Sequence, residues 1–168
     1  MAISKLNLED FCNEVFSLFA IHTDLDDYRL AYFLNKYLGI NLCRKAFDLD
    51  FVNSKGSFSV FEHIDQTNFL KWSLISNIYN HSFSAKTSNN DLFLESNNLV
   101  QKVNLLTEYK NVNYLLKIEN NDNQVDLEDV VKEIKRIPQV ITLYDINKDL
   151  KNKLVNNNPI SERIFVFK

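Results

Sequence analysis

Glycine is nearly absent from this chain of 168 residues, which contains only Gly39 and Gly56. Loops that bind nucleotide phosphates need several glycines close together, because their backbone approaches the anion and adopts positive φ. Two isolated glycines form neither a P-loop nor a dinucleotide-binding loop. The usual nucleotide-dependent enzymes are therefore excluded.

Cysteine is equally scarce, and Cys12 and Cys43 lie far apart in the sequence. Two cysteines without CxxC spacing exclude a disulfide framework and a cysteine-rich zinc site. Acidic residues interrupt the first apolar segment, and no apolar run approaches the ~20 residues that span a bilayer. We therefore predict a cytoplasmic protein with two buried, reduced thiols, no membrane segment and no cofactor.

A surplus of positive charge is also missing, since the formal net charge is −3. General nucleic-acid binders carry a basic face, so this balance argues against nucleic acid as a partner and leaves room only for a local basic patch. What the chain does have is a hydrophobic content of 45%, including thirteen Phe and seven Tyr. This composition predicts a folded chain, and its length predicts a single domain over residues 1–168.

In the N-terminal half, residues 14–22 predict a strand that is buried on both faces. Thr23 is then expected at the N-cap of a helix over residues 24–38, with Asp26 completing a pair that resembles a capping box. Gly39 is expected to end this helix, because it can adopt positive φ.

The middle of the chain favours an antiparallel meander. Residues 41–51 predict a strand in which apolar residues alternate with Asp48 and Asp50. Predicted strands over residues 57–64 and 69–78 follow with short connections, as antiparallel neighbours do.

The C-terminal half begins with residues 80–98, which are polar and predict a long loop with one short strand. Residues 112–119 then predict a strand, residues 126–137 a helix whose N-cap is Asp126, and residues 139–146 another strand. Residues 14–22, 24–38 and 41–51 repeat the strand–helix–strand order of residues 112–119, 126–137 and 139–146. The predicted fold is an α+β class with a mainly antiparallel sheet and two helices, ferredoxin-like or related to the split βαβ arrangement, with inserted strands.

The most recognisable stretch is residues 106–114, Leu-Thr-Glu-Tyr-Lys-Asn-Val-Asn-Tyr. Its spacing matches Ile-Pro-Glu-x-x-x-Val-Asp-Tyr, and the chain resembles the bacterial family named after that motif, IPExxxVDY. Other stretches that look similar to the family are residues 22–32, residues 48–51, the region of Trp72 and residues 115–119.

The motif is kept at Glu108, Val112 and Tyr114 and changed elsewhere. Thr107 replaces a proline and so leaves φ unfixed in the turn. Asn113 replaces an aspartate and removes a carboxylate, so a role that needs that charge is in doubt. The family has no assigned activity, and the resemblance therefore implies a small bacterial protein without assigning a catalytic residue.

Five residues are candidates for a binding site. Glu108 and Tyr109 precede a strand, where loops often carry function. Tyr114 and Trp72 are large aromatics suited to an interface, and His22 ends a strand beside several aspartates. The alternative for each is structural: a turn for Glu108 and Tyr109, core packing for Tyr114 and Trp72, and the edge of a helix for His22.

Two sets of side chains are candidates for a divalent metal. His22 with Asp24 combines an imidazole with carboxylates, and Asp48 with Asp50 places two carboxylates on one strand face. Helix capping explains the first set and a solvent-facing strand explains the second, so neither predicts a metal site on its own.

Three functions follow from these observations. The first is a non-enzymatic protein-interaction or accessory module, with a protein partner or a homodimer, because no strong catalytic constellation exists. The second is an RNA- or ribosome-associated factor in which strand aromatics such as Phe58, Phe61 and Trp72 stack on bases beside Lys71. The third is a metal-dependent enzyme that uses the His and Asp clusters. Whether the chain is an enzyme stays open, and the lack of a strong catalytic constellation favours a protein that is not an enzyme.

Overall fold

The computed structural model describes residues 16–50, 57–84, 98–120 and 125–146. These residues form strands and two helices, α1 (Asp27–Leu38) and α2 (Leu127–Lys135). The strands are β1 (Phe16–Thr23), β2 (Cys43–Arg44), β3 (Leu49–Asp50), β4 (Ser57–Phe58), β5 (Val60–Asp65), β6 (Leu70–Ser76), β7 (Ile78–Ser84), β8 (Asn98–Asn104), β9 (Tyr114–Asn120) and β10 (Val140–Asp145).

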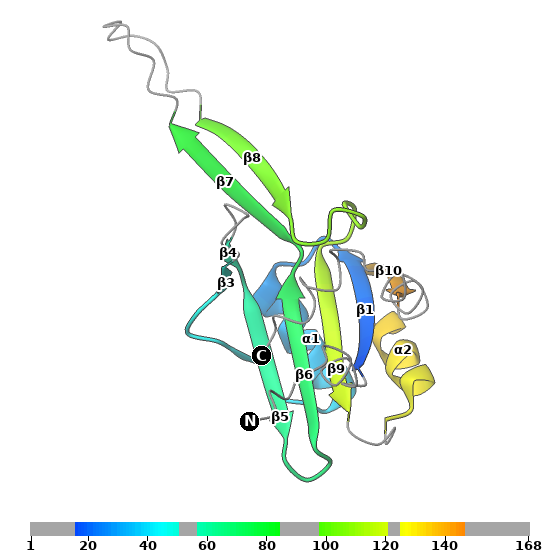
Figure 1. The fold of residues 1–168 in the computed structure, drawn as a ribbon. Coiled ribbons are helices and arrows are strands. Elements are labelled where there is room, and N and C mark those ends of the chain that lie inside the picture. Colours follow the sequence, from blue (N-terminus) through cyan, green and yellow to red (C-terminus); the bar gives the residue numbers. More distant parts are fainter. Residues whose placement is uncertain (1–15, 51–56, 85–97, 121–124, 147–168) are drawn as a thin grey trace, which may run out of the picture.

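Six strands form one sheet in the order β10-β1-β9-β6-β5-β2 (Figure 1). Every neighbouring pair in it is antiparallel. Strands β9 and β10 therefore run parallel to each other on either side of β1, and α2 connects them as in a split βαβ unit. The predicted α+β class, with two helices and inserted strands on a mainly antiparallel sheet, is confirmed. The ferredoxin-like interpretation stays a prediction.

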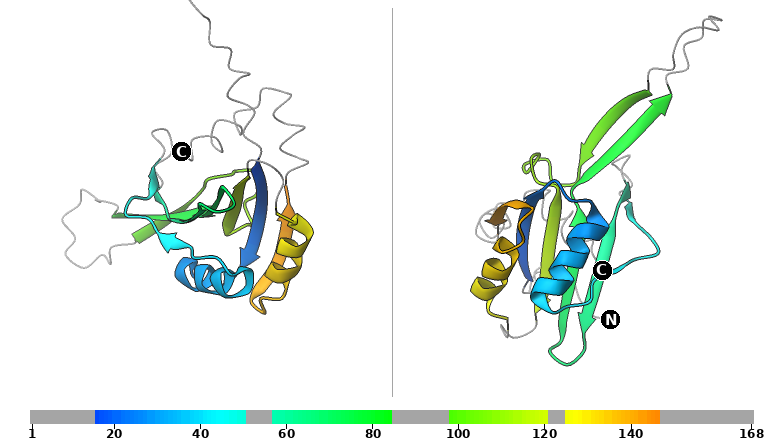
Figure 2. Two further views of the ribbon diagram at one scale, coloured as in Figure 1. Left: turned by 90° about the horizontal axis from the view of Figure 1, so that it is seen from below. Right: turned by 180° about the vertical axis from the view of Figure 1, so that it is seen from behind.

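Both helices cover the same face of the sheet (Figure 2). We call the buried residues on that face the helix-side cluster and those on the other face the opposite-face cluster. The helix-side cluster includes Phe19, Ile21, Leu30, Leu34, Trp72, Leu74, Tyr114, Leu116, Ile118, Val130 and Ile134. The opposite-face cluster includes Leu18, Ala20, Phe58, Val60, Ile75, Leu105, Leu106, Val112 and Leu115.

Strand β9 shows how the side chains of one strand alternate between these two clusters. Leu115 belongs to the opposite-face cluster and Leu116 to the helix-side cluster, because successive side chains of a strand point to opposite faces. Leu116 lies between Phe19 of β1 and Leu74 of β6. Strand β1 is likewise buried on both faces, as its nearly continuous apolar run predicts.

Helix α1 begins later than the sequence predicts. Its N-cap is Asp26, whose side chain makes no capping hydrogen bond. Thr23, the predicted N-cap, is the last residue of β1, and its hydroxyl donates to the Gln139 carbonyl at 2.7 Å. The prediction of a capping box at Thr23 is therefore wrong, because β1 continues through Thr23, which pairs with Val140, and its hydroxyl accepts from Leu25 N, two residues before α1 begins.

The other helix boundaries agree better with the sequence. Gly39 ends α1 with a φ of 66° in the left-handed region, which glycine adopts without steric cost. Asp126 caps α2, and its carboxylate accepts from the backbone N–H groups of Glu128 at 2.9 Å and Asp129 at 3.4 Å. Neither helix, nor any other within the described ranges, is long and apolar enough to cross a membrane.

The prediction of one strand over residues 41–51 is wrong. Two short strands, β2 and β3, occur there and belong to different sheets. Between them the Arg44 guanidinium forms an ion pair with Asp48, four residues later. Phe47 is 84% exposed, and Cys43, whose thiol is predicted to be buried, is exposed as well because β2 is a short strand at the edge of the sheet. The alternating apolar residues therefore do not form a continuous strand. The chain turns between β2 and β3, and the ion pair closes this turn.

The predicted loop over residues 80–98 is wrong at both ends. Strand β7 continues to Ser84 and β8 starts at Asn98, and the two pair antiparallel from Ile78↔Asn104 to Ser84↔Asn98. Residues 85–97 lie outside the described residues. The β7–β8 hairpin extends away from the six-stranded sheet (Figures 1 and 2). Because a projecting ribbon need not bury either face, its sequence lacks the apolar alternation that identifies a strand.

Candidate functional site

A turn over residues 105–113 joins the hairpin to β9, and it is organised by one buried side chain. Asn77, which lies between β6 and β7, is fully buried. Its amide nitrogen donates to the carbonyls of Tyr109 and Val112, both at 2.9 Å, and its amide oxygen accepts from Leu106 N at 2.8 Å. Its backbone bonds to both ends of the turn at 2.8 Å. Asn77 therefore fixes the root of the hairpin to the motif.

The last two motif residues hold the start of α1. The Asn113 side-chain oxygen accepts from Thr23 N at 3.1 Å and from His22 Nδ1 at 2.7 Å. The Tyr114 hydroxyl donates to the Leu25 carbonyl at 2.8 Å. Because the Asn113 oxygen is an acceptor only, His22 Nδ1 is the donor in this hydrogen bond. Residues about 90 positions apart in sequence thus form one junction.

This junction shows what the Asn113 side chain contributes. An aspartate and an asparagine both present an oxygen that can accept the two hydrogen bonds, so the contact needs an acceptor and not a charge. Thr107 and Glu108 are exposed, and the Thr107 hydroxyl donates to Glu108 Oε2 at 3.4 Å. The motif is held to the rest of the fold through its backbone and through the side chains of its last two residues.

The predicted binding residues separate in the structure. His22 and Tyr114 meet the same junction, through Asn113 and the Leu25 carbonyl. Trp72 is only 5% exposed and lies in the helix-side cluster. Tyr109 is half-buried against the opposite-face cluster, and Glu108 is exposed. Sequence reasoning missed Asn77, although a polar residue interrupting an apolar run was a signal for it.

The residues considered for metal binding do not gather. Asp48 forms an ion pair with Arg44 and accepts from the Ser57 hydroxyl at 3.3 Å. Asp24 is exposed, and the Asp50 side chain lies outside the described residues. Within the described ranges, no group of three His, Cys, Asp or Glu residues is placed to hold a metal ion.

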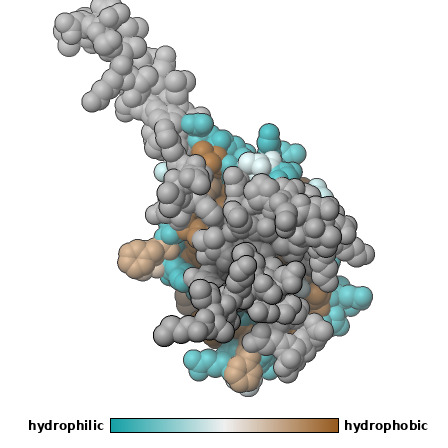
Figure 3. Space-filling view, in the orientation of Figure 1, coloured by the Kyte–Doolittle hydropathy of each residue, from teal (hydrophilic) through white to brown (hydrophobic). Residues whose placement is uncertain are grey.

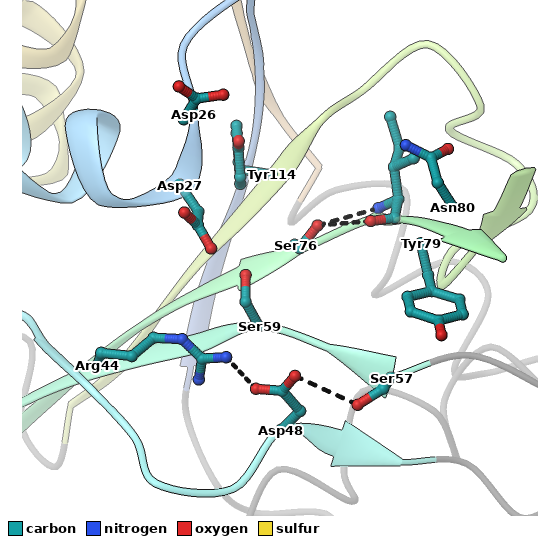
Figure 4. A pocket seen from close by; sticks show the side chains of 11 residues that line it. Asp26, Asp27, Arg44, Asp48, Ser57, Ser59, Ser76, Tyr79, Asn80 and Tyr114 are labelled. Atoms are coloured by element: carbon teal, nitrogen blue, oxygen red, sulfur yellow. Dashed lines mark hydrogen bonds and ion pairs between the residues drawn. The ribbon is translucent and has the colours of Figure 1, made fainter. Parts of the chain in front are cut away.

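An open groove lies between the start of α1, β4, β5 and the root of the hairpin, with a volume of about 400 Å³ (Figure 4). Its lining is mainly polar and comes from several segments between residues 26 and 114. The lining residues are Asp26, Asp27, Arg44, Asp48, Ser57, Ser59, Ser76, Ile78, Tyr79, Asn80 and Tyr114.

The charges in the groove are not balanced. Arg44 is paired with Asp48, which leaves Asp26 and Asp27 as additional negative charges. Burial raises the pKa of the Tyr114 phenol above its ordinary value, and the charges of Asp27 and Asp26 raise it further. Tyr114 therefore stays protonated and keeps donating to Leu25. The groove carries a negative potential that a cationic group would relieve.

A chain of ion pairs crosses the face of the sheet opposite the helices. Glu62 contacts Lys45 at 2.8 Å and Lys71 at 3.5 Å, and Glu119 lies 3.9 Å from Lys71. Lys117, which is 1% exposed, lies 2.5 Å from Glu119 as an ion pair without hydrogen-bond geometry. No local pattern indicates these ion pairs, because cross-strand register brings their members together. Each lysine lies within 4 Å of a glutamate, so the chain of ion pairs is a structural element of the sheet face.

Exposed hydrophobic side chains are dispersed. On the face that Figure 3 displays, hydrophobic colour appears at separate points outside the grey atoms. The large exposed hydrophobic residues are Tyr28, Tyr32, Phe47, Ile64, Phe69, Ile141 and Tyr144. Phe69 is 75% exposed and has a φ of 53°, which is unusual for a residue other than glycine.

Comparison of the chain with protein-family models, with curated proteins and with solved structures finds no match.

Proposed function

We propose that this chain is a non-enzymatic protein-interaction module of the bacterial cytoplasm, and that the β7–β8 hairpin is the element that contacts the partner. The observation that carries the proposal is the direction of the hairpin, which leaves the six-stranded sheet and extends outward (Figure 1). Asn77 anchors its root with five hydrogen bonds, counting side chain and backbone.

A hairpin that projects from the sheet with a fixed root contributes little to the stability of the fold, so a contact with a partner is a reason for it to exist. Two-stranded ribbons are marginally stable in water, because they bury little apolar surface. Their edges present unpaired backbone groups that another chain can pair with. A rigid root lowers the entropy cost of binding, because the ribbon keeps one direction relative to the sheet. These properties suit a contact element.

The resemblance to the IPExxxVDY family belongs to the same proposal. The stretch that carries it, residues 106–114, contributes the backbone groups that Asn77 binds and the two side chains that hold α1. We infer that the motif is a structural signature that sets the hairpin and the first helix in place. Such a role requires spacing and hydrogen-bond acceptors, and no catalytic group.

No observation favours the other two functions equally. Phe58, Phe61 and Trp72, the rings considered for base stacking, are each at most 7% exposed. Lys71 already contacts Glu62 and Glu119. The carboxylates considered for metal binding are dispersed within the described ranges.

Site-specific photo-cross-linking tests the proposal. A photoreactive amino acid at Lys102, which is exposed on β8, is compared with the same amino acid at Lys135, which is exposed on α2. In cells of a bacterium that expresses the protein, we expect one adduct of defined mass from position 102 and none from position 135. The cross-linked protein, once identified, must then bind the purified chain in a fixed ratio.

The oligomeric state distinguishes a homodimer from a complex with another protein. If the adduct is a second copy of the chain, light scattering of the purified protein must show a dimer. Equal cross-linking from both positions, or none from position 102 together with a monomer in solution, would refute the proposal.

A further inference from the structure

The groove beside the hairpin root suggests what kind of side chain the partner contributes. It adjoins the first residues of β7, because Ile78, Tyr79 and Asn80 line it. A partner that binds the hairpin from this side passes over the groove. The volume, about 400 Å³, falls in the lower part of the range of roughly 300–1,000 Å³ typical of ligand pockets.

The negative charges of the groove favour a cationic ligand. Asp48 already has a cationic partner in Arg44, whereas Asp26 and Asp27 form no ion pair within the described residues. The Asp26 carboxylate, at the N-cap of α1, makes no capping bond. Asp27 Oδ1 accepts from Tyr28 N at 2.7 Å and keeps its second oxygen for another donor.

Hydroxyl groups lie opposite the Asp27 carboxylate (Figure 4). Figure 4 shows the Asp27 carboxylate and the Ser59 hydroxyl facing each other across the groove. The Ser76 hydroxyl lies near them and donates to the Ile78 carbonyl at 2.8 Å. A cation with several donors in fixed directions can therefore bond to a carboxylate and to a hydroxyl oxygen together.

We propose that the groove binds an arginine side chain of the protein partner that contacts the β7–β8 hairpin. This inference rests on the proposed function. A guanidinium is planar and presents five donors as a rigid fork, which matches a carboxylate in a two-point contact. A lysine ammonium would meet the same charge without that match, and an acidic or phosphorylated segment would be repelled by Asp26 and Asp27.

A titration of the full chain with N-acetyl-arginine amide tests the inference without a known partner. Amide shifts in two-dimensional NMR spectra are followed with this probe and with N-acetyl-citrulline amide, which has the same shape and no charge. We expect saturable shifts at Asp27, Ser59, Ser76 and Asn80 with the arginine probe, and at most a tenth of that affinity with citrulline, because charge-assisted hydrogen bonds are about twice as strong as neutral ones.

Two double variants supply the control. D26N/D27N removes both groove charges and keeps an asparagine at the N-cap, which helices accept well. E128Q/D129N makes the same change of charge in the first turn of α2. We expect a loss of affinity of about tenfold or more in the first variant and none in the second. Spectra of the free variants that keep the other resonances in place show that folding is unchanged.

The outcomes separate this inference from the proposed function. Equal binding of citrulline, or equal binding by D26N/D27N, refutes an arginine site in the groove even if position 102 still cross-links to a partner. Saturable, charge-dependent binding of the arginine probe supports the site. If that binding is seen while position 102 gives no adduct, the interaction role fails and the groove stands as a site for a small cation.

Discussion

The two helices of this protein start in different ways. Helix α2 is capped locally, since the Asp126 carboxylate accepts from two N–H groups of its own first turn. Helix α1 has an aspartate at the same position, Asp26, and that side chain caps nothing. Its entry is held instead by Thr23, Asn113 and Tyr114, which belong to the sheet and the motif. One helix start is therefore encoded by neighbouring residues and the other by residues far away in the sequence.

The comparison teaches what the motif does. A long-range cap couples α1 to the β8–β9 turn, and Asn77 couples the same turn to the hairpin. A local cap leaves its carboxylate occupied, whereas the long-range cap leaves Asp26 available to the groove. The arrangement that makes α1 depend on the motif therefore also gives the groove its charge.

The largest expected effect comes from removing the shared acceptor at Asn113. N113A leaves the buried Thr23 N–H and the His22 Nδ1–H without a partner, and we expect a loss of about 2–3 kcal/mol in the free energy of unfolding. N113D, the residue of the motif, keeps the acceptor and is expected within about 0.5 kcal/mol of the native chain. Chemical denaturation measures both. An equal loss in the two variants would show that the contact needs the amide itself.

A smaller loss is expected when Thr23 becomes valine. T23V keeps the shape but removes a hydroxyl that donates to the Gln139 carbonyl at 2.7 Å and accepts from Leu25 N at 3.2 Å. Since Thr23 is 1% exposed, we expect about 1.5–2 kcal/mol of destabilisation. Hydrogen exchange should locate the change at the first turn of α1. Faster exchange confined to α2 would contradict a role of Thr23 at the α1 entry.

The residues of this entry show where sequence reasoning reached its limit. The strand–helix–strand order of residues 112–146, Gly39 and Asp126 were predicted correctly, because apolar periodicity and local caps are written in neighbouring residues. Thr23 was misassigned because β1 continues through it, paired with Val140 of β10. Strand pairing across the sheet decides that contact, and no local pattern records it.

The candidate site was predicted in part for the same reason. His22 and Tyr114 were named, and the structure joins them through Asn113 and Leu25. Asn77 and the groove were not, because they depend on where the hairpin leaves the sheet. Residues 80–98 carry no apolar period, so the hairpin on which the proposed function depends could not be predicted from the sequence.

The Tyr114 hydroxyl tests the long-range cap through pH. Y114F removes the bond to the Leu25 carbonyl, and we expect a loss of about 1 kcal/mol at pH 7. Burial, with the charges of Asp27 and Asp26, holds the pKa of this phenol above its ordinary value of 10. In the unfolded chain the phenol loses its proton first, so its contribution is constant below about pH 10 and falls as pH rises further.

The difference in unfolding free energy between the native chain and Y114F should therefore be constant up to about pH 10 and shrink above it. Denaturation at several pH values measures this difference, and the other tyrosines cancel in it because both chains contain them. A difference that stays constant through pH 11 would show that Tyr114 titrates alike in the folded and unfolded chains, and that its burial at the α1 entry does not perturb it.

The smallest effects compare the two capping positions directly. D126A removes an acceptor for two N–H groups, and we expect a loss of about 1 kcal/mol. D26A removes a carboxylate that caps nothing, so we expect less than about 0.5 kcal/mol, limited to its interaction with the helix dipole. The salt dependence of the loss in unfolding free energy distinguishes the two variants. Screening weakens the dipole interaction lost in D26A and leaves the effect of the hydrogen bonds lost in D126A nearly unchanged. Equal losses in D26A and D126A would mean that Asp26 caps α1 in solution, and the groove would then lose one of the two carboxylates that we assign to an arginine.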